Sequence, residues 1–282
     1  MQWLVAGGNG MLGKDMLATL RDRGEDAVGL DRDELDITDA EATRPALDGF
    51  DVVVNCAAWT AVDHAEEHEA EAFAVNAVGA ANLSRAARAA GAKIVQISTD
   101  YVFAGDATEP YAEGAAPAPR SAYGRTKAAG EWAVRAENPD HLVVRTAWLY
   151  GAGGACFPRT IARAAGERGE LEVIVDQVGQ PTWTRDLADL IVRMVAADVA
   201  PGTYHGTASG RTSWHGFAQA VVAAAGMDPA IVRTTTSASY VRPATRPAYS
   251  VLGHQMLRAA RVAPIGDWAE RWDVAAREVL AG

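Results

Sequence analysis

The chain has 282 residues, of which 49% are hydrophobic and 22% are charged, and its formal net charge at pH 7 is −10. This composition is that of an ordinary globular protein with enough apolar residues for a buried core. The acidic charge argues against a nucleic-acid-binding protein, which commonly has a basic patch, but it leaves small anionic ligands open.

Two cysteines, Cys56 and Cys156, are too few for a disulfide framework and do not have the spacing of a zinc site. No stretch is apolar over the length that a bilayer-spanning helix needs, and the apolar run at residues 2–6 is too short for a signal peptide. We therefore expect a soluble, cytoplasmic protein that does not act at a membrane.

The first predicted strand covers residues 2–6 and is followed by a glycine-rich turn and a helical segment. Gly7 and Gly10 allow a tight turn and a close approach of the backbone to a diphosphate, and Gly13 lets the helix pack on the strand. The helix N-terminus then faces the anion. The position directly after a strand favours dinucleotide binding over a plain turn with incidental glycines.

The second predicted strand, residues 27–30, ends at an acidic residue. Asp31 is placed to bond the hydroxyl groups of an adenosine ribose. Arg32 beside it could instead neutralise a 2′-phosphate, so the sequence leaves both NAD and NADP open. Further along, Asp36 could accept a hydrogen bond from the adenine amino group.

The third predicted strand, residues 51–55, leads into small residues. Ala57 and Ala58 leave room for a ligand at the carboxyl end of a parallel strand. The next stretch is rich in alanine, and we expect one long helix over residues 66–90. Asn76 lies within this helix, and a structural hydrogen bond is the favoured interpretation of its side chain.

The fourth predicted strand, residues 93–97, delivers Ser98, Thr99 and Asp100. Hydroxyl groups at the end of a strand can cap the next element or bond a substrate carbonyl, and both interpretations remain open here. A loop rich in glycine, proline and glutamate, residues 104–120, separates this strand from the next helix.

Tyr123 and Lys127 lie four residues apart on that helix and therefore on the same face. A nearby ammonium favours the phenolate, so we expect Lys127 to lower the pKa of Tyr123 from the ordinary value of about 10. Such a phenol can pass a proton near neutral pH, as carbonyl reduction requires. An exposed pair on a solvated helix is the alternative interpretation.

A fifth predicted strand, residues 141–146, completes an alternation that predicts an α/β fold with a Rossmann-like, doubly wound parallel sheet. We expect an NAD(P)-binding domain over residues 1–151, with about 184–200 returning to it. Residues 152–282 are expected to form mainly a smaller substrate-binding part, to which the short segment 202–205 is assigned.

Six stretches in the chain carry a resemblance to a known family. They are residues 55–63 (NCAAWTAVD), 98–103 (STDYVF), 123–127 (YGRTK), 145–151 (RTAWLYG), 176–182 (DQVGQPT) and 246–252 (RPAYSVL). Together with the glycine turn, they resemble the extended short-chain dehydrogenase/reductase superfamily and, within it, the dTDP-4-dehydrorhamnose reductase family. Each motif alone is weak, whereas the whole set in this order, over nearly the full chain, is specific.

The resemblance implies that the chain reduces the 4-keto group of dTDP-4-dehydro-β-L-rhamnose to dTDP-L-rhamnose with NADPH or NADH. It implies that Tyr123 supplies the proton, that the Thr99 hydroxyl bonds the same oxygen, and that Lys127 also binds the nicotinamide ribose. The cofactor-binding residues that it implies are Gly7, Gly10, Met11, Leu12, Gly13, Asp31, Asp36, Ile37, Ala57, Ala58, Trp59, Tyr123 and Lys127. The residues that it implies for the nucleotide-sugar substrate are Thr99, Asp100 and Trp148.

The roles of one tryptophan and two arginines each allow two interpretations. Trp148 is either core filler or a sugar contact, and its place at the carboxyl mouth of the sheet favours contact. Arg242 and Arg246 either bind the nucleotide diphosphate or are solvated surface charges. Residues 182–186 lack the glutamate that a magnesium-bridged dimer of this family would need, so we expect no metal and a monomer or metal-free homodimer.

The sequence leaves three alternative functions open. The fold also includes regulatory subunits that bind a cofactor and a partner protein without turnover, but an intact Thr99, Tyr123 and Lys127 set argues against one. A dehydratase or epimerase of a nucleotide sugar is a second alternative; dehydratases have an Asp-Glu pair after the catalytic hydroxyl, where this chain has Asp100-Tyr101. The third is a 4-ketoreductase of another deoxysugar nucleotide.

Overall fold

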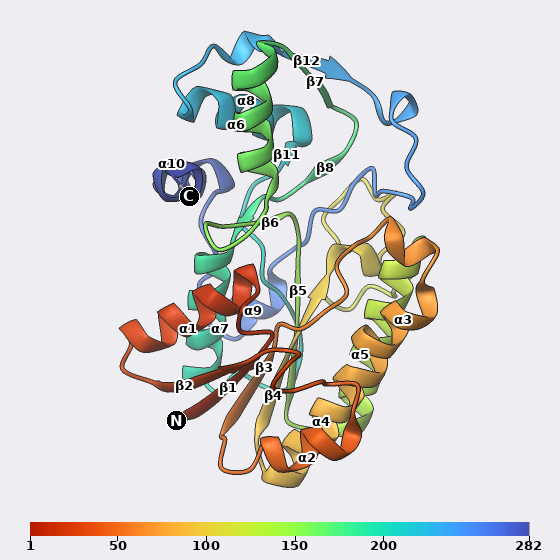
Figure 1. The fold of residues 1–282 in the computed structure, drawn as a ribbon, viewed down its shortest axis with the longest axis vertical. Coiled ribbons are helices and arrows are strands. Elements are labelled where there is room, and N and C mark those ends of the chain that lie inside the picture. Colours follow the sequence, from red (N-terminus) through yellow and green to blue (C-terminus); the bar gives the residue numbers. More distant parts are fainter. Residues whose placement is uncertain (282) are drawn as a thin grey trace.

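A six-stranded parallel sheet forms the centre of the computed structural model, which describes residues 1–281 (Figure 1). The strand order is β10-β5-β4-β3-β1-β2, so the chain reverses its direction of winding between β1 and β3. This is the Rossmann-like, doubly wound α/β fold that the sequence predicts, and ligands of such sheets bind where the winding reverses. The strands are β1 (Gln2–Ala6), β2 (Asp26–Leu30), β3 (Val52–Asn55), β4 (Lys93–Thr99), β5 (His141–Thr146) and β10 (Gly202–His205).

Helices cover both faces of this sheet, which is why its central strands are apolar almost throughout. Within residues 1–281, no helix is both long enough and apolar enough to span a membrane. One face packs on α1 (Met11–Asp22), α7 (Thr184–Ala196) and α9 (Gln255–Ala259), and the other on α2 (Ala40–Ala46), α4 (Ala80–Ala90) and α5 (Ala122–Glu137).

The sixth strand, β10, differs from the sequence-based expectation. Residues 202–205 were assigned to the smaller part, but they pair in parallel with β5, with Gly202 opposite Leu142 and His205 opposite Arg145. The helix α7 supplies the crossover that brings the chain back to the sheet. Four residues of mixed polarity have no periodicity that distinguishes a sheet edge from a loop, so only the tertiary structure reveals this pairing.

The predicted long helix over residues 66–90 is interrupted in the structure. A 3₁₀ turn, η1 (His64–Glu66), precedes α3 (Glu69–Phe73), and a π-helical turn, η2 (Ala74–Gly79), joins α3 to α4. The prediction of one α-helix from Glu66 is therefore wrong at its start and in its middle. A π-turn changes the direction of side chains within a helix and frequently occurs at functional sites. Here it places Asn76, which is buried.

A smaller part lies beyond the carboxyl ends of the strands, at the top of Figure 1. Its core is aromatic: Tyr150, Phe217 and Trp272 pack with ring centroids 5.4 to 5.5 Å apart. Its helices are α6 (Phe157–Arg168), α8 (Trp214–Ala224) and α10 (Trp268–Ala281). Its paired short strands are β12 (Val232–Thr235) with β7 (Leu171–Ile174), β11 (Thr212–Ser213) with β8 (Val178–Gly179), and β9 (Thr182–Trp183) with β6 (Leu149–Tyr150).

Candidate active site

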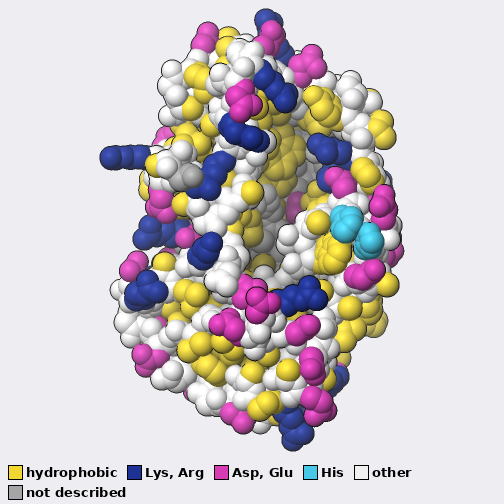
Figure 2. Space-filling model, viewed as in Figure 1, with side chains coloured by type: hydrophobic (Ala, Val, Ile, Leu, Met, Phe, Trp, Pro, Cys, Tyr) yellow, Lys and Arg dark blue, Asp and Glu magenta, His cyan; other side chains and the backbone are white. Residues whose placement is uncertain are grey.

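A cleft lies between the carboxyl edge of the sheet and the smaller part, and Figure 2 shows it as a hollow with hydrophobic side chains on its walls. It consists of two adjoining cavities of about 320 and about 650 Å³. Gly10, Cys56 and Ala58 line both cavities, so the two form one continuous site. Every residue that the sequence analysis assigned to the cofactor or the substrate lines one of them.

The glycine turn between β1 and α1 forms the floor of this cleft. Gly7 has a φ of 77°, and a Cβ atom there would lie 2.7 Å from the backbone nitrogen of Ala57. At Gly13 a Cβ atom would lie 2.2 Å from the carbonyl oxygen of Gly7. Both positions therefore exclude a side chain, and the helix α1 starts at Met11 with its free amide groups facing the cleft.

The smaller cavity has the polar groups expected around an adenosine. Asp31 accepts hydrogen bonds from the backbone amides of Asn9 (3.0 Å) and Arg32 (2.8 Å). Asp36 accepts from the hydroxyl of Thr38 (2.7 Å) and from its amide (2.9 Å), and these bonds lower the pKa of Asp36. Arg32 lines the same cavity, so a cation and two carboxylates face a ligand there.

The wall at Trp59 is tied to the helix that carries the tyrosine. Asn76 accepts a hydrogen bond from the backbone amide of Trp59 (2.9 Å) and donates one to its carbonyl (3.1 Å). The same amide group donates to the hydroxyl of Thr126 on α5 (3.0 Å). The expectation that Asn76 is a structural hydrogen bonder is thus confirmed, and the π-turn aims it at both elements.

Thr99, Tyr123 and Lys127 meet in the larger cavity. Thr99 is the last residue of β4, whereas the other two lie on the first two turns of α5. The helix begins where the side chain of Ser121 accepts a hydrogen bond from the amide of Gly124 (3.1 Å). The residue types that carbonyl reduction requires therefore converge from two elements at one place.

The pKa of Tyr123 differs from the sequence-based expectation. Burial raises it to about 12, although the neighbouring Thr99 hydroxyl acts in the opposite direction. Lys127 is not among the groups that shift this pKa, and its ammonium donates to the carbonyl oxygen of Ile97 at 2.7 Å. The expected lowering of the pKa is therefore wrong for this arrangement, and Tyr123 is a protonated phenol at neutral pH.

Lys127 is itself buried, and burial lowers its pKa to about 8. The carboxylate of Glu131, one turn further along α5, acts in the opposite direction and favours the ammonium. Burial also raises the pKa of Cys56, which faces the lysine, to about 12. That thiol remains protonated, so it does not serve as a counter-ion.

Asp100 directly follows Thr99 and bonds its hydroxyl. Thr99 donates a hydrogen bond to its Oδ1 atom (2.9 Å) and accepts one from the amide of Tyr101 (3.2 Å). Burial raises the pKa of Asp100 to about 6. Its other oxygen is buried and has no partner at hydrogen-bond distance among residues 1–281, although the hydroxyl of Ser250 is close enough to act against the effect of burial on this pKa.

The wall opposite the tyrosine is aromatic. Trp148 faces the cleft, and its indole stacks on that of Trp214 with centroids 3.6 Å apart and planes 6° apart. Trp214, the first residue of α8, was missed by the sequence analysis because a tryptophan at the start of an amphipathic helix is usually core. Tyr101, which packs edge-on to Tyr123 at 5.6 Å, was likewise not assigned to the site.

The two arginines considered for the diphosphate are both close to one acid. Arg246 donates to Asp63 at 2.9 Å, and a nitrogen of Arg242 lies 3.9 Å from the same carboxylate. The amide of Ala244 also donates to Asp63 (3.2 Å). These bonds fasten the loop before residue 250 to the segment after Trp59, so Arg246 is not a freely solvated charge.

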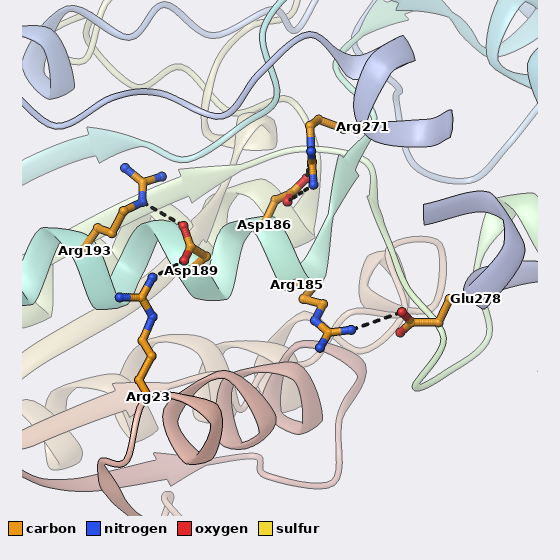
Figure 3. Close-up of polar contacts among 7 residues, drawn as sticks. All are labelled: Arg23, Arg185, Asp186, Asp189, Arg193, Arg271 and Glu278. Carbon is orange, nitrogen blue, oxygen red and sulfur yellow. Dashed lines mark hydrogen bonds and ion pairs between the residues drawn. The ribbon is translucent and has the colours of Figure 1, made fainter. Parts of the chain in front are cut away.

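The region considered for magnesium is occupied by ion pairs (Figure 3). Asp186 receives two hydrogen bonds of 2.8 Å from Arg271, and Arg185 pairs with Glu278. Asp189 binds both Arg193 and Arg23. Within residues 1–281, no group of three or more acidic, histidine or cysteine side chains has the arrangement of a metal site.

Known proteins are similar to this chain in architecture and in sequence. The chain matches the family model described as the RmlD substrate binding domain over residues 1–280. It is 47% identical over 274 residues to a dTDP-4-dehydrorhamnose reductase of Streptomyces griseus, which covers 95% of this chain and 90% of that protein. It is 44% identical over 270 residues to a dTDP-4-keto-6-deoxy-D-glucose reductase of Streptomyces niveus, with 95% and 93% covered.

A solved structure extends the comparison to the cofactor. The dTDP-4-dehydrorhamnose reductase of Bacillus anthracis, determined in complex with NADP, superimposes with a TM-score of 0.94 at 36% identity. The match covers 98% of this chain and 99% of that one. The relatives are therefore reductases of nucleotide-linked keto sugars, and one of them has been seen with a nicotinamide cofactor.

Proposed function

The chain belongs to the RmlD substrate-binding-domain family, and from this premise we propose that it reduces the 4-keto group of dTDP-4-dehydro-β-L-rhamnose to dTDP-L-rhamnose. The observation that carries the proposal is the meeting of Thr99, Tyr123 and Lys127 in a cleft continuous with a dinucleotide crevice. Relatives with this name and a neighbouring structure with NADP support the choice of substrate and of NADPH or NADH.

The glycine turn, the start of α1 and the acidic pair would hold the cofactor. The backbone amides of Met11 and Leu12 would bind the diphosphate, and Asp31 and Asp36 would bind the adenosine. When bound, the reduced nicotinamide would supply the hydride for the carbonyl carbon. Lys127 lines the larger cavity, and its ammonium would bond ribose hydroxyls there.

Tyr123 acts as the acid. As negative charge develops on the former carbonyl oxygen, the phenol would transfer its proton to it, and the Thr99 hydroxyl, turned away from Asp100, would donate a second hydrogen bond. A phenol with a pKa of about 12 is fully protonated at pH 7, which is the state that reduction needs.

The aromatic wall would contact the sugar. Trp148 and Asp100 line the same cavity as Thr99, so both would lie near the sugar. We place this reaction in the cytoplasm, with the nucleotide sugar and the nicotinamide cofactor as its small-molecule partners.

A second candidate substrate follows from one relative. The similar enzyme of Streptomyces niveus is named for dTDP-4-keto-6-deoxy-D-glucose, a ketone of the same type with different sugar stereochemistry. The catalytic residues serve both ketones equally, because Thr99 and Tyr123 address only the carbonyl oxygen. The choice between the two substrates therefore rests on the wall that contacts the rest of the sugar ring.

The test is the loss of absorbance at 340 nm when the protein is mixed with NADPH, or NADH, and dTDP-4-keto-6-deoxy-D-glucose, with and without a 3,5-epimerase. Consumption of cofactor only with the epimerase establishes the rhamnose substrate. Consumption without the epimerase establishes the second candidate. Cofactor binding without consumption in either mixture would refute both and favour a regulatory subunit.

A further inference from the structure

Trp148 has an uncommon backbone conformation at the edge of the cleft. Its φ of 48° lies in the left-handed region, which bulky residues rarely adopt. Such a conformation persists only where the surroundings hold it in place, and these residues cluster at ligand sites. The contacts that hold Trp148 are therefore candidates for a role in ligand positioning.

Two residues of the smaller part restrain the indole of Trp148. Trp214 covers one face with its own indole, in nearly parallel stacking at 3.6 Å. At Gly179, a Cβ atom would lie 2.5 to 2.7 Å from three atoms of the Trp148 ring, so only glycine fits there. In addition, the backbone amide of Thr182 donates to the Trp148 carbonyl at 3.2 Å.

The two restraining residues are themselves coupled. β8 and β11 pair in an antiparallel manner with Gly179 opposite Thr212, two residues before Trp214. The ring of Phe157 packs against that of Trp214 at a centroid distance of 4.5 Å and an angle of 49°. α8 starts directly at Trp214, with Ser213 accepting a hydrogen bond from the amide of Gly216 (3.0 Å). Trp214 is therefore fixed by a strand pair, a helix start and an aromatic neighbour.

The indole pair lies in the same cavity as Thr99 and Tyr123. A flat aromatic surface suits the apolar C–H groups of a sugar ring, because the electron-rich face of the indole attracts weakly positive hydrogens. We propose that Trp214 and Gly179 are positioning residues that hold the Trp148 indole as a wall for the pyranose ring of the nucleotide sugar. This proposal rests on the proposed function, in that the ligand is a nucleotide sugar.

The test compares the affinities of dTDP-L-rhamnose and of dTDP for the protein saturated with NADP⁺, by titration calorimetry. The ratio of the two dissociation constants gives the contribution of the rhamnose group to the affinity. The variants are Trp214→Leu and Gly179→Ala. Their matched controls are Trp132→Leu, at an exposed position on α5, and Gly166→Ala on α6, where an added Cβ atom meets nothing within 4 Å.

We expect both variants to weaken dTDP-L-rhamnose binding about tenfold, a loss of about 1.4 kcal/mol. Binding of dTDP and of NADP⁺ should stay within twofold of wild type, and the controls should change nothing. Near-ultraviolet circular dichroism should lose the signal of the stacked indoles in Trp214→Leu and keep it in Trp132→Leu.

If the ratio of the two dissociation constants is the same as wild type in both variants, the proposal is overturned. An equal loss of affinity for dTDP and for dTDP-L-rhamnose would leave that ratio unchanged and would overturn it as well. A wild-type protein that binds both ligands equally would also overturn it. If Trp214→Leu does not fold, Gly179→Ala and the milder Trp214→Phe still decide the matter. This assay measures the binding of the two products and not the rate of reduction. A protein that fails the reductase assay but shows the expected ratio of dissociation constants would therefore refute the reductase assignment alone.

Discussion

The carboxylate of Glu131 is completely buried and receives two hydrogen bonds of 2.8 Å from the guanidinium of Arg145. The hydroxyl of Ser98 donates a further bond of 2.6 Å to the same carboxylate. The ion pair connects α5 to β5, and the Ser98 bond connects α5 to β4. Glu131 lies one helical turn after Lys127, and Ser98 lies one residue before Thr99. The positions of Lys127 and Thr99 therefore depend on a charge pair that does not line the cleft.

We predict that Glu131→Gln lowers the free energy of unfolding by about 3 kcal/mol, because it leaves the buried Arg145 charge without its counter-ion. The matched control is Glu137→Gln on the same helix, whose exposed pair with Arg85 should contribute less than about 1 kcal/mol. Urea denaturation measures both. Equal losses in the two variants would show that the buried pair has no special role.

The same pair should make stability depend on pH. Burial alone would raise the pKa of Glu131, but Arg145 and Ser98 hold it below the ordinary value of 4.5. A carboxyl whose pKa is lower in the folded state than in the unfolded state stabilises the protein fully at pH values above the unfolded-state pKa. This contribution decreases as the pH falls from the unfolded-state pKa through the folded-state pKa. Wild type should therefore lose more stability than Glu131→Gln when urea denaturation is repeated at pH 7 and at pH 4.

The activity should fall as the pH rises through about 8. Lys127, with a pKa of about 8, must be protonated to bind the ribose in the proposed mechanism. Tyr123, at about 12, stays protonated throughout. The profile of kcat/KM measures this alkaline limb, and activity that rises between pH 8 and pH 10 would contradict the role proposed for Lys127.

Glu131→Gln should also shift the alkaline limb of that profile. The Glu131 carboxylate favours the charged form of Lys127, so its removal lowers the pKa of the lysine further. The limb should move to lower pH, whereas Glu137→Gln should leave it in place. An unmoved limb in Glu131→Gln would mean that another group titrates near pH 8.

Arg32→Ala should weaken NADPH more than NADH. The guanidinium of Arg32 lines the smaller cavity beside Asp31, where it can neutralise a 2′-phosphate that the carboxylate would otherwise repel. We expect the dissociation constant of NADPH to rise about tenfold and that of NADH by less than threefold, as measured by fluorescence titration. An equal change for both cofactors would show that Arg32 does not contact the 2′-phosphate.

Chelation should leave the enzyme unchanged. Asp186, in the region where a bridging metal would be sought, is neutralised by two hydrogen bonds from Arg271 (Figure 3). We expect EDTA to alter neither the initial rate nor the molar mass measured by light scattering, whether the protein is a monomer or a dimer. Dissociation on adding EDTA, with recovery in magnesium, would refute this expectation.

Local patterns were sufficient for the parts of the fold and site that depend on neighbours in sequence. Gly7 and Gly13 are needed by a turn of seven residues, and Tyr123 and Lys127 share a helix face by spacing alone. The parallel sheet followed from the alternation of apolar strands with helices. These features are specified within one or two elements, so the sequence predicts them.

The remaining features depend on contacts between distant segments. Trp214 stacks on Trp148, which lies 66 positions earlier in the chain, and no periodicity links the two. The pKa of Tyr123 was mispredicted because the spacing of two residues on a helix gives no information on burial, which is the largest cause of the shift. Residues 202–205 join the main sheet only because α7 returns them to β5.

Whether Tyr123 is the acid of a 4-ketoreductase is tested by Tyr123→Phe. The measurement is the rate of NADPH consumption at 340 nm with dTDP-4-dehydro-β-L-rhamnose, alongside the dissociation constant of NADPH. We expect kcat to fall at least about a hundredfold, because a general acid contributes a factor of this order, and cofactor binding to stay within about twofold of wild type. A variant that keeps the wild-type kcat would remove Tyr123 from the mechanism.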